Sequence, residues 1–303
     1  MAAAPFSAVF FEGRFVSPGG DEARVPLTSR GYLLGDGVFE TLRGYDGVCF
    51  RAERHLAYLA RGAAMFGLRV PVEARRLLAV VHEAASRTGV RDAYVRVTLT
   101  RGEDEEHPLL SVISRPLVVP TDDAYANGVP STIVSWRRLP PSCMDPTTKT
   151  TSYAPQVLAA RQAASRGVGE GDGLMLSVDG RLACATMANV FVVEGDVLRT
   201  PSLSTGCRAG TTREAVLEVA QRAGLTPLEE DVDAGALFVA DEVFLTSSRV
   251  ECLPVDSIDG REIGRARRGD APRHPRTAAI RAALRAMVAG EQTRATTPAR
   301  STA

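Results

Sequence analysis

The chain has 303 residues, 45% of them hydrophobic and 24% charged, which are ordinary values for a globular protein. Its 36 basic and 36 acidic residues cancel, so charge indicates neither nucleic acid nor an anionic membrane surface as a partner. No apolar run approaches the roughly 18 residues that a membrane span needs, and the apolar start lacks the basic segment of a signal peptide.

The first third of the sequence predicts alternating strands and helices. Residues 7–16 read as a strand pair, and hydrophobic residues recur at helical spacing over 51–68 and 72–89. Residues 93–102 and 109–119 alternate as strands, and the polar, turn-forming stretch 120–128 indicates a linker.

Beyond the linker the pattern continues with a strand at 131–136 and a helix at 154–167. Two hairpins follow over 174–186 and 189–200, and Asp179-Gly180 in the first suits a type I′ turn. A helix over 211–224 and a strand over 241–248 complete the pattern.

This order predicts an α+β protein of two domains. We expect a small N-terminal α/β domain over 1–119, a linker over 120–128 and a larger domain over 129–289. The tail 290–303 has nothing to bury and is expected to be disordered.

Cysteine and histidine spacing gives no metal signature. The five cysteines are odd in number, widely spaced and without a C-x-x-C motif, which favours free thiols in a reducing cytoplasm. The four histidines lack metal-ligand spacing as well, so we predict no metal site.

Lys149 is the single lysine among 36 basic residues. Arginine serves where only a positive charge is needed, whereas an amine can lose its proton and attack a carbonyl. Two hydroxyl-rich segments, 210–214 and 245–249, could hold a phosphate. Together they suggest an enzyme with a phosphorylated aldehyde cofactor; a solvated surface lysine and ordinary helix capping are the plain alternatives.

Several motifs, taken in order, make a family resemblance. They are "SRGYLLGDGVFETLRGYDGVCFRAERHL" (29–56), "AYVRVTLTRG", "KTTSYAPQVLAARQAAS", "LMLSVDGRLACATMANVFVV", "GTTREAVLEVA" and "ADEVFLTSSRVECLPV". In order and spacing the chain resembles, to about residue 262, the fold-type IV pyridoxal-phosphate enzymes: branched-chain and D-amino-acid aminotransferases and aminodeoxychorismate lyase. The resemblance implies a strongly curved sheet in the larger domain, a small-molecule substrate and a homodimer.

The resemblance also implies roles for matching residues around the reacting atoms. Lys149 would form the Schiff base with pyridoxal 5'-phosphate and then move the proton at the substrate's α-carbon. Tyr153 would lie near the cofactor's phenolic oxygen. Phe39 and Arg96 would line the substrate side, and the glycines of "GDG" at 35–37 would let the backbone come close.

The phosphate end of the cofactor is implied in the same way. Thr211 and Thr212 match the turn that holds the phosphate, and Ser248 matches a further hydroxyl, with Ser247 beside it. The family's phosphate-binding arginine is replaced by Tyr58, which loses a charge-assisted contact of about 1.5–3 kcal/mol, or roughly ten- to hundredfold in affinity. Arg54 and Arg61 lie about one helical turn to either side.

A second departure concerns the cofactor's ring nitrogen. The family places a glutamate five residues before Asn189, and this chain has Cys184 there. A thiol with a reference pKa of about 8.5 is mostly neutral at pH 7 and does not keep the ring nitrogen protonated. We therefore expect transamination to suffer more than elimination.

Three functions remain open from the sequence. The first is a pyridoxal-phosphate enzyme, aminotransferase or lyase, whose cofactor binding is weak or lost. The second is a cofactor-independent enzyme on the same fold that uses Lys149 as a base or imine-forming amine. The third, a non-catalytic relative, is disfavoured by the retained lysine. Glu106 and His107 do not match the recognition loop of the D-amino-acid enzymes, which disfavours that substrate class.

Overall fold

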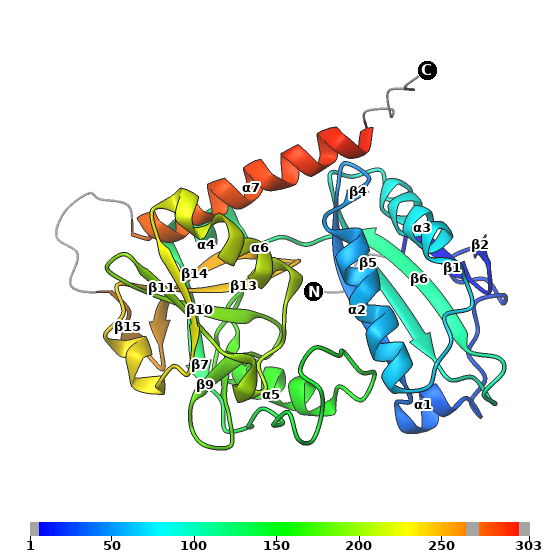
Figure 1. Cartoon of the computed structure of the whole chain (residues 1–303), viewed down its shortest axis with the longest axis horizontal. Coiled ribbons are helices and arrows are strands. Elements are labelled where there is room, and N and C mark those ends of the chain that lie inside the picture. The colour runs from blue at the N-terminus through cyan, green and yellow to red at the C-terminus, as the bar shows by residue number, and fades with distance from the viewer. Residues whose placement is uncertain (1–5, 265–272, 297–303) are drawn as a thin grey trace. The chain divides into compact units, whose positions relative to one another are not determined.

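The computed structural model describes residues 6–264 and 273–296 (Figure 1). Its contacts divide the chain into two compact units. The first holds the residues up to Val118, the segment Thr148–Ser152 and the residues from Ala286 on; the second holds Val119–Thr147 and Tyr153–Arg285. The boundary after Val118 lies beside the expected start of the linker, whereas Thr148–Ser152 groups with the first unit although the larger domain was expected to carry the lysine.

In the described residues the first unit is built on a six-stranded sheet with strand order β2-β1-β6-β5-β3-β4. The strands are β1 (Ala8–Phe11), β2 (Arg14–Val16), β3 (Gly37–Tyr45), β4 (Val48–Cys49), β5 (Asp92–Thr100) and β6 (Leu109–Pro116). The helices are α1 (Arg30–Leu34), α2 (Ala52–Met65) and α3 (Ala74–Ser86). All neighbouring strands in this sheet are antiparallel.

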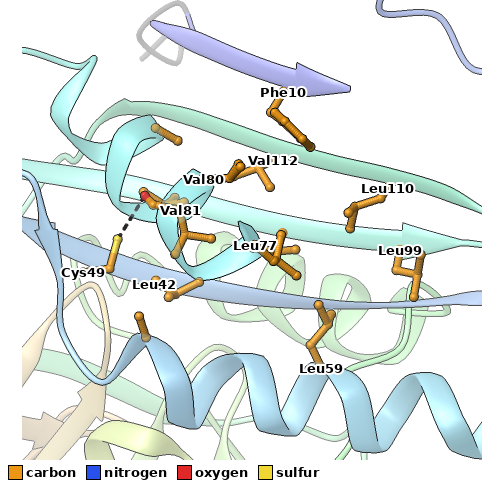
Figure 2. Close-up of a cluster of buried hydrophobic side chains, with 14 of the residues drawn as sticks. Phe10, Leu42, Cys49, Leu59, Leu77, Val80, Val81, Leu99, Leu110 and Val112 are labelled. Atoms are coloured by element: carbon orange, nitrogen blue, oxygen red, sulfur yellow. Dashed lines mark hydrogen bonds between the residues drawn. The ribbon is translucent and has the colours of Figure 1, made fainter. Parts of the chain in front are cut away.

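The hydrophobic core of this unit lies between one face of the sheet and helices α2 and α3 (Figure 2). Strand β5 shows how the sequence specifies it, because buried and half-buried residues alternate along its whole length. Val95, Val97 and Leu99 are fully buried and pack in one cluster with Leu59 of α2 and Val81 of α3. The alternation predicted at 93–102 is confirmed as far as Thr100, where β5 ends.

The opposite face of the same sheet has a different chemistry. Because cross-strand partners share a face, the register of β3, β5 and β6 places Phe39 with Thr98, and Thr41 with Arg96. Arginines and aromatic rings recur along this face, which α2 and α3 do not cover. The predicted site residues Phe39 and Arg96 lie on it.

The second unit contains, in the part of the chain that the structure describes, a nine-stranded sheet. Its strands are β7 (Val129–Ile133), β8 (Gly173–Leu176), β9 (Leu182–Ala185), β10 (Asn189–Glu194), β11 (Val197–Pro201), β12 (Thr226–Glu230), β13 (Glu242–Ser247), β14 (Glu251–Ile258) and β15 (Arg261–Glu262). The order is β12-β11-β10-β13-β14-β7-β8-β9, with β15 beside β14. Since β9 also contacts β10 and β11, the sheet curves back on itself; the expected curved sheet is confirmed.

The helices of the second unit include α4 (Asp122–Asn127), α5 (Ala154–Ser165) and α6 (Thr211–Val219). Short 3₁₀ turns occur at Leu203–Thr205, Ala220–Ala223 and Ala234–Phe238. Helix α4 occupies the stretch expected to be a linker; Thr121 caps it by accepting a hydrogen bond from the Ala124 amide.

Helix α7 (Pro275–Thr296) was not predicted from the sequence. Residues 290–296 are helical where a disordered tail was expected, and residues 297–303 lie outside the described residues. The helix is anchored at this end: Gln292 donates a hydrogen bond to the Tyr45 carbonyl at 2.8 Å, and Glu291 accepts one from the Arg51 amide at 3.2 Å. Across the described residues, no helix combines the length and apolarity needed to cross a membrane.

The β8–β9 hairpin also differs in detail from its prediction. A type I′ turn needs a positive φ at both central residues, but of Asp179 and Gly180 only the glycine has one, at 82°. The Gly180 amide donates to the Ser177 carbonyl at 3.1 Å, and the Ser177 amide donates to the Arg181 carbonyl at 2.8 Å. The loop is therefore one residue longer than expected and ends in a left-handed glycine.

Candidate active site

Lys149 is positioned by a short strand-like pairing with β3. The Phe39 amide donates to the Lys149 carbonyl and the Thr151 amide donates to the Gly37 carbonyl, both at 2.9 Å. Val38 and Thr150 are the partners between these bonds. This pairing explains why the lysine segment groups with the first unit. It also places the Lys149 side chain on the face of the sheet that α2 and α3 do not cover.

Glycines make this close approach possible. A Cβ at Gly35 would lie 2.4 Å from the Ser152 hydroxyl, and the φ of Gly35 is 66°. A Cβ at Gly37 would lie 2.7 Å from the Leu99 carbonyl oxygen. A larger residue at Gly35 would therefore push the lysine segment away, whereas one at Gly37 would push β3 away from β5.

Phe39 joins Lys149 to Arg96. The Lys149 Nζ lies 5.4 Å from the centroid of the Phe39 ring, and the Arg96 guanidinium carbon lies 3.7 Å from it. Nε of Arg96 donates to the Thr98 hydroxyl at 3.0 Å. Phe39 itself is buried, so the ring is a fixed platform between the two cations. The structure thus brings together three residues predicted from separate motifs.

Tyr58 lies on α2 and is held by a neighbouring arginine. Nη2 of Arg54 donates to the Tyr58 hydroxyl at 3.1 Å, and its guanidinium carbon lies 4.7 Å from the ring centroid. One turn further, a Cβ at Gly62 would lie 3.0 Å from Cγ2 of Thr148. The Thr148 hydroxyl is buried and has no hydrogen-bond partner among the described residues. Because buried polar groups are usually hydrogen-bonded, this hydroxyl next to Lys149 in the chain is available to a further partner.

The turn before α6 is the first feature of the second unit suited to an anion. Helix α6 starts at Thr211, with Gly210 as its N-cap and no side-chain cap, and both Thr211 and Thr212 are buried. The positive end of the helix dipole lies here. The Asn189 side chain fixes the turn, because its Nδ2 donates to the Arg208 carbonyl at 2.7 Å. A Cβ at Gly210 would lie only 2.1 Å from Oδ1 of Asn189.

The second hydroxyl segment follows β13. Ser247 and Ser248 are half-buried, and Oγ of Ser247 accepts a hydrogen bond from the Val250 amide at 3.4 Å. Thr246, just before them, pairs across the sheet with Asn189 and so shares its face. The Thr246 hydroxyl is buried without a hydrogen-bond partner among the described residues.

Tyr153 and Cys184 lie in a third group within the second unit. Burial raises the pKa of Tyr153, and the positive charges of Arg138 and Arg208 oppose that rise. Burial likewise raises the pKa of the Cys184 thiol, with Arg138 opposing and Asp172 adding to the shift. The thiol therefore stays neutral near pH 7, as the sequence indicated, and it packs in an apolar cluster with Met175 and Cys207.

The predicted site residues thus fall into two sets. Lys149, Phe39, Arg96 and Tyr58 belong to the first unit, and Tyr153, Cys184, Thr211, Thr212, Ser247 and Ser248 belong to the second. The sequence analysis missed Asn189 and Asp172 as structural supports. Asp172 accepts hydrogen bonds from the Thr186 hydroxyl and the Met187 amide, and so holds the end of the hairpin that carries Cys184. The sequence feature that could have indicated Asp172 is its position next to Gly173, directly before an apolar strand.

Comparisons with known proteins identify the family of this chain. The model of the family described as "Amino-transferase class IV" matches residues 37–258. A putative branched-chain-amino-acid aminotransferase of Methanocaldococcus jannaschii is 33% identical over 271 residues, covering 86% of this chain and 91% of that protein. A D-alanine aminotransferase of Bacillus licheniformis is 30% identical over 281 residues, which cover 89% of this chain and 95% of that protein.

A solved structure shows the same likeness. The branched-chain aminotransferase of Thermoproteus uzoniensis with norvaline has a TM-score of 0.82 at 30% identity, covering 95% of this chain and 97% of that one. A further branched-chain amino acid aminotransferase, solved with pyridoxamine 5'-phosphate, has a TM-score of 0.85 at 25% identity and covers 96% of each chain. The chain belongs to the class IV aminotransferase family and has the fold-type IV architecture.

Proposed function

We propose that this chain is a pyridoxal-phosphate-dependent aminotransferase whose reacting amine is Lys149. The observation that carries the proposal is the position of the single lysine: backbone pairing with β3 fixes its segment, and its Nζ lies over Phe39 on the face that carries Arg96. The proposed substrate is an amino acid, bound on that face.

Each unit, taken by itself, offers residues that fit one of the three ends of a phosphorylated aldehyde cofactor. Lys149 offers the amine. The turn at Gly210 offers a helix N-terminus with buried threonines, and the unpartnered Thr246 hydroxyl shares a sheet face with Asn189. Pyridoxal phosphate, when bound, supplies the electron sink that acidifies the substrate's α-carbon.

The third end is where this chain differs. The family's glutamate at the ring nitrogen is replaced by the neutral, buried Cys184, so the sink is weaker. We propose that the cofactor binds nonetheless, and that reactions in which the α-carbon loses its negative charge at once, as in elimination by a lyase, are less affected than full transamination. Lys149 moves the α-proton in either case.

Two further parts of the proposal concern assembly and compartment. Leu27, Tyr32, Leu33 and Leu34 expose large apolar side chains around α1, which supports the homodimer that the resemblance implies. The five cysteines are free thiols, which supports a cytoplasmic enzyme. Sedimentation of the purified protein tests the first point: a monomer at micromolar concentration contradicts it.

The single lysine allows a direct test of the cofactor linkage. Purified protein is mixed with pyridoxal phosphate, reduced with borohydride, digested and analysed by mass spectrometry. The expected result is one labelled peptide that contains Lys149, and no such label in Lys149→Arg, since a guanidinium stays protonated. Turnover in Lys149→Arg should fall by at least about 10²-fold. A wild-type protein that takes up no label and shows no visible cofactor band contradicts the proposal.

A further inference from the structure

Arg138 lies beside the hairpin that carries Cys184. Its amide donates to the Leu176 carbonyl at 2.8 Å, at the end of β8. In the pairing of β8 with β9, Met175 is opposite Cys184. Arg138 is therefore attached to the strand next to residue 184, and all four residues belong to the second unit.

The side chain of Arg138 is fixed at Gly206. Its Nε donates to the Gly206 carbonyl at 2.7 Å, and a Cβ at Gly206 would lie 3.1 Å from Cγ of Arg138, so the stem packs against this turn. The next residue, Cys207, lies in one buried cluster with Cys184. The backbone and the side chain of Arg138 are thus both bound to elements that adjoin Cys184.

The charge of Arg138 acts on two residues to which the resemblance gives a role at the cofactor ring. Burial raises the pKa of Cys184, and Arg138 is the strongest influence that opposes the rise. The same holds for the pKa of Tyr153, where Arg208 adds a smaller effect of the same sign. Because such interactions weaken with distance, the guanidinium lies near both side chains. Residue 184 is the position implied for the ring nitrogen, and Tyr153 the one implied for the phenolic oxygen.

No acidic side chain among the described residues compensates this charge. The Arg138 side chain is half-buried, and within residues 6–264 and 273–296 it makes a single hydrogen bond, that of Nε, and no ion pair. Asp172 also acts on Cys184, but its carboxylate accepts hydrogen bonds from the Thr186 hydroxyl and two backbone amides instead. A glutamate at residue 184 would offer the guanidinium a carboxylate, whereas the neutral thiol does not.

We propose that Arg138 takes the place of that glutamate: a terminal nitrogen of its guanidinium donates a hydrogen bond to the ring nitrogen of pyridoxal phosphate and keeps that nitrogen unprotonated. A guanidinium has donors only and stays charged, so it binds the nitrogen's lone pair and not a protonated ring. Its positive charge also disfavours a second positive charge nearby. This inference rests on the proposed function and deepens it, because an unprotonated ring favours reactions that discharge the α-carbon at once.

The test measures the affinity of the protein for three cofactor aldehydes that differ at one ring position. Pyridoxal phosphate has the nitrogen lone pair, deazapyridoxal phosphate has a C–H group in its place, and N-methylpyridoxal phosphate has a methyl group and a fixed positive charge. Arg138→Met removes the guanidinium and keeps an unbranched stem. Arg137→Met is the matched control, because Arg137 is adjacent and exposed. Fluorescence titration gives the dissociation constants, after thermal unfolding has shown that each variant folds.

We expect the preference for pyridoxal phosphate over the deaza analogue to be roughly 10- to 100-fold larger in wild type than in Arg138→Met, which is the effect of one hydrogen bond from a charged donor. The N-methyl analogue should change in the opposite sense and bind more tightly to Arg138→Met than to wild type. Arg137→Met should match wild type with all three aldehydes.

A second measurement follows the ring nitrogen itself. With this nitrogen isotope-labelled, its NMR shift against pH reports its protonation. Removing the positive charge raises the pKa of the ring nitrogen, so on lowering the pH protonation should begin earlier in Arg138→Met than in wild type. If Arg138→Met does not fold, wild type alone decides. A ring protonated at pH 7 overturns the proposal, and an unprotonated ring together with the preference over the deaza analogue supports it.

A merely structural role of Arg138 and a failure of the proposed function give different results. Equal loss of affinity for all three aldehydes in Arg138→Met, or an unchanged preference among them, overturns the role of Arg138 while the labelling of Lys149 still stands. If wild type binds no pyridoxal phosphate and Lys149 takes up no label, the aminotransferase proposal fails and the assignment of Arg138 falls with it.

Discussion

The turn that opens α6 and the hairpin that carries residue 184 lie in the same unit and have opposite chemistry. The turn combines a glycine N-cap, buried threonines and the Asn189 side chain that holds its backbone, so it is prepared for an anion. The hairpin buries the Cys184 thiol among apolar side chains and keeps it neutral. Under the proposed function, the turn would hold the cofactor phosphate, and the neutral thiol would lie where the resemblance implies a glutamate at the ring nitrogen. The two roles would then belong to separate elements and can be tested separately.

The largest effect on this contrast is expected from Cys184→Glu, which introduces the acidic residue that the resemblance implies at this position. If residue 184 faces the ring nitrogen, a carboxylate in contact with it is worth up to about 4 kcal/mol in a partly screened site. The half-reaction with an amino acid should then accelerate by up to about a thousandfold. Stopped-flow absorbance of the bound cofactor measures it.

A matched control for this variant is Cys184→Ser, which is similar in size and carries no charge. The buried carboxylate costs stability, so thermal unfolding of both variants is recorded first. A folded Cys184→Glu protein that binds the cofactor and reacts at the wild-type rate shows that residue 184 does not face the ring nitrogen. A rate gain shared by the serine variant points to packing as the cause.

The turn before α6 is tested from the other side, by Gly210→Ala. The added Cβ would lie 2.1 Å from Oδ1 of Asn189, so either the turn or the asparagine must move, and overpacking of this kind costs about 1–3 kcal/mol. We expect affinity for pyridoxal phosphate to fall by roughly ten- to hundredfold. Fluorescence titration with the cofactor measures the loss.

Gly290→Ala is the matched control, because nothing lies within 4 Å of a Cβ there and the residue is inside α7. That variant should bind the cofactor as wild type does and gain slightly in stability, by about 0.5–1 kcal/mol. Unchanged cofactor affinity in Gly210→Ala contradicts the assignment of the turn to the phosphate.

Much of the fold was predictable from the sequence because its signals are local. The alternation along β5 reports directly which side chains face α2 and α3. Strand β3 was harder to predict, because eight of its nine residues are buried. Side chains on both faces of the strand are covered, so the sequence does not alternate between apolar and polar residues. The last turns of α7 were predicted to be disordered because their sequence is polar. They are held in place by residues far away in the sequence: Gln292, for example, donates a hydrogen bond to the Tyr45 carbonyl.

The candidate site was predictable only where residue chemistry is rare. Lys149 stands out as a candidate because it is the single lysine of the chain. Nothing in the sequence shows, however, that its segment pairs with a strand more than 100 residues earlier. Asn189 was recognised only as part of a motif, because its contact with the Arg208 carbonyl joins residues 19 positions apart and leaves no local pattern.

Tyr58→Arg is the smallest expected effect and tests the phosphate contact that the resemblance implies for this position of α2. The resemblance gives this position an arginine that contacts the phosphate, a contact worth about 1.5–3 kcal/mol. Arg54 now donates to the Tyr58 hydroxyl at 3.1 Å, so the new guanidinium would lie beside an existing one, and their repulsion offsets part of the gain. We expect affinity for pyridoxal phosphate to rise by up to about tenfold. Tyr58→Phe is the control, and the double variant Arg54→Gln, Tyr58→Arg should recover the remainder. Equal affinity in all four proteins shows that the phosphate anchor does not include this part of α2.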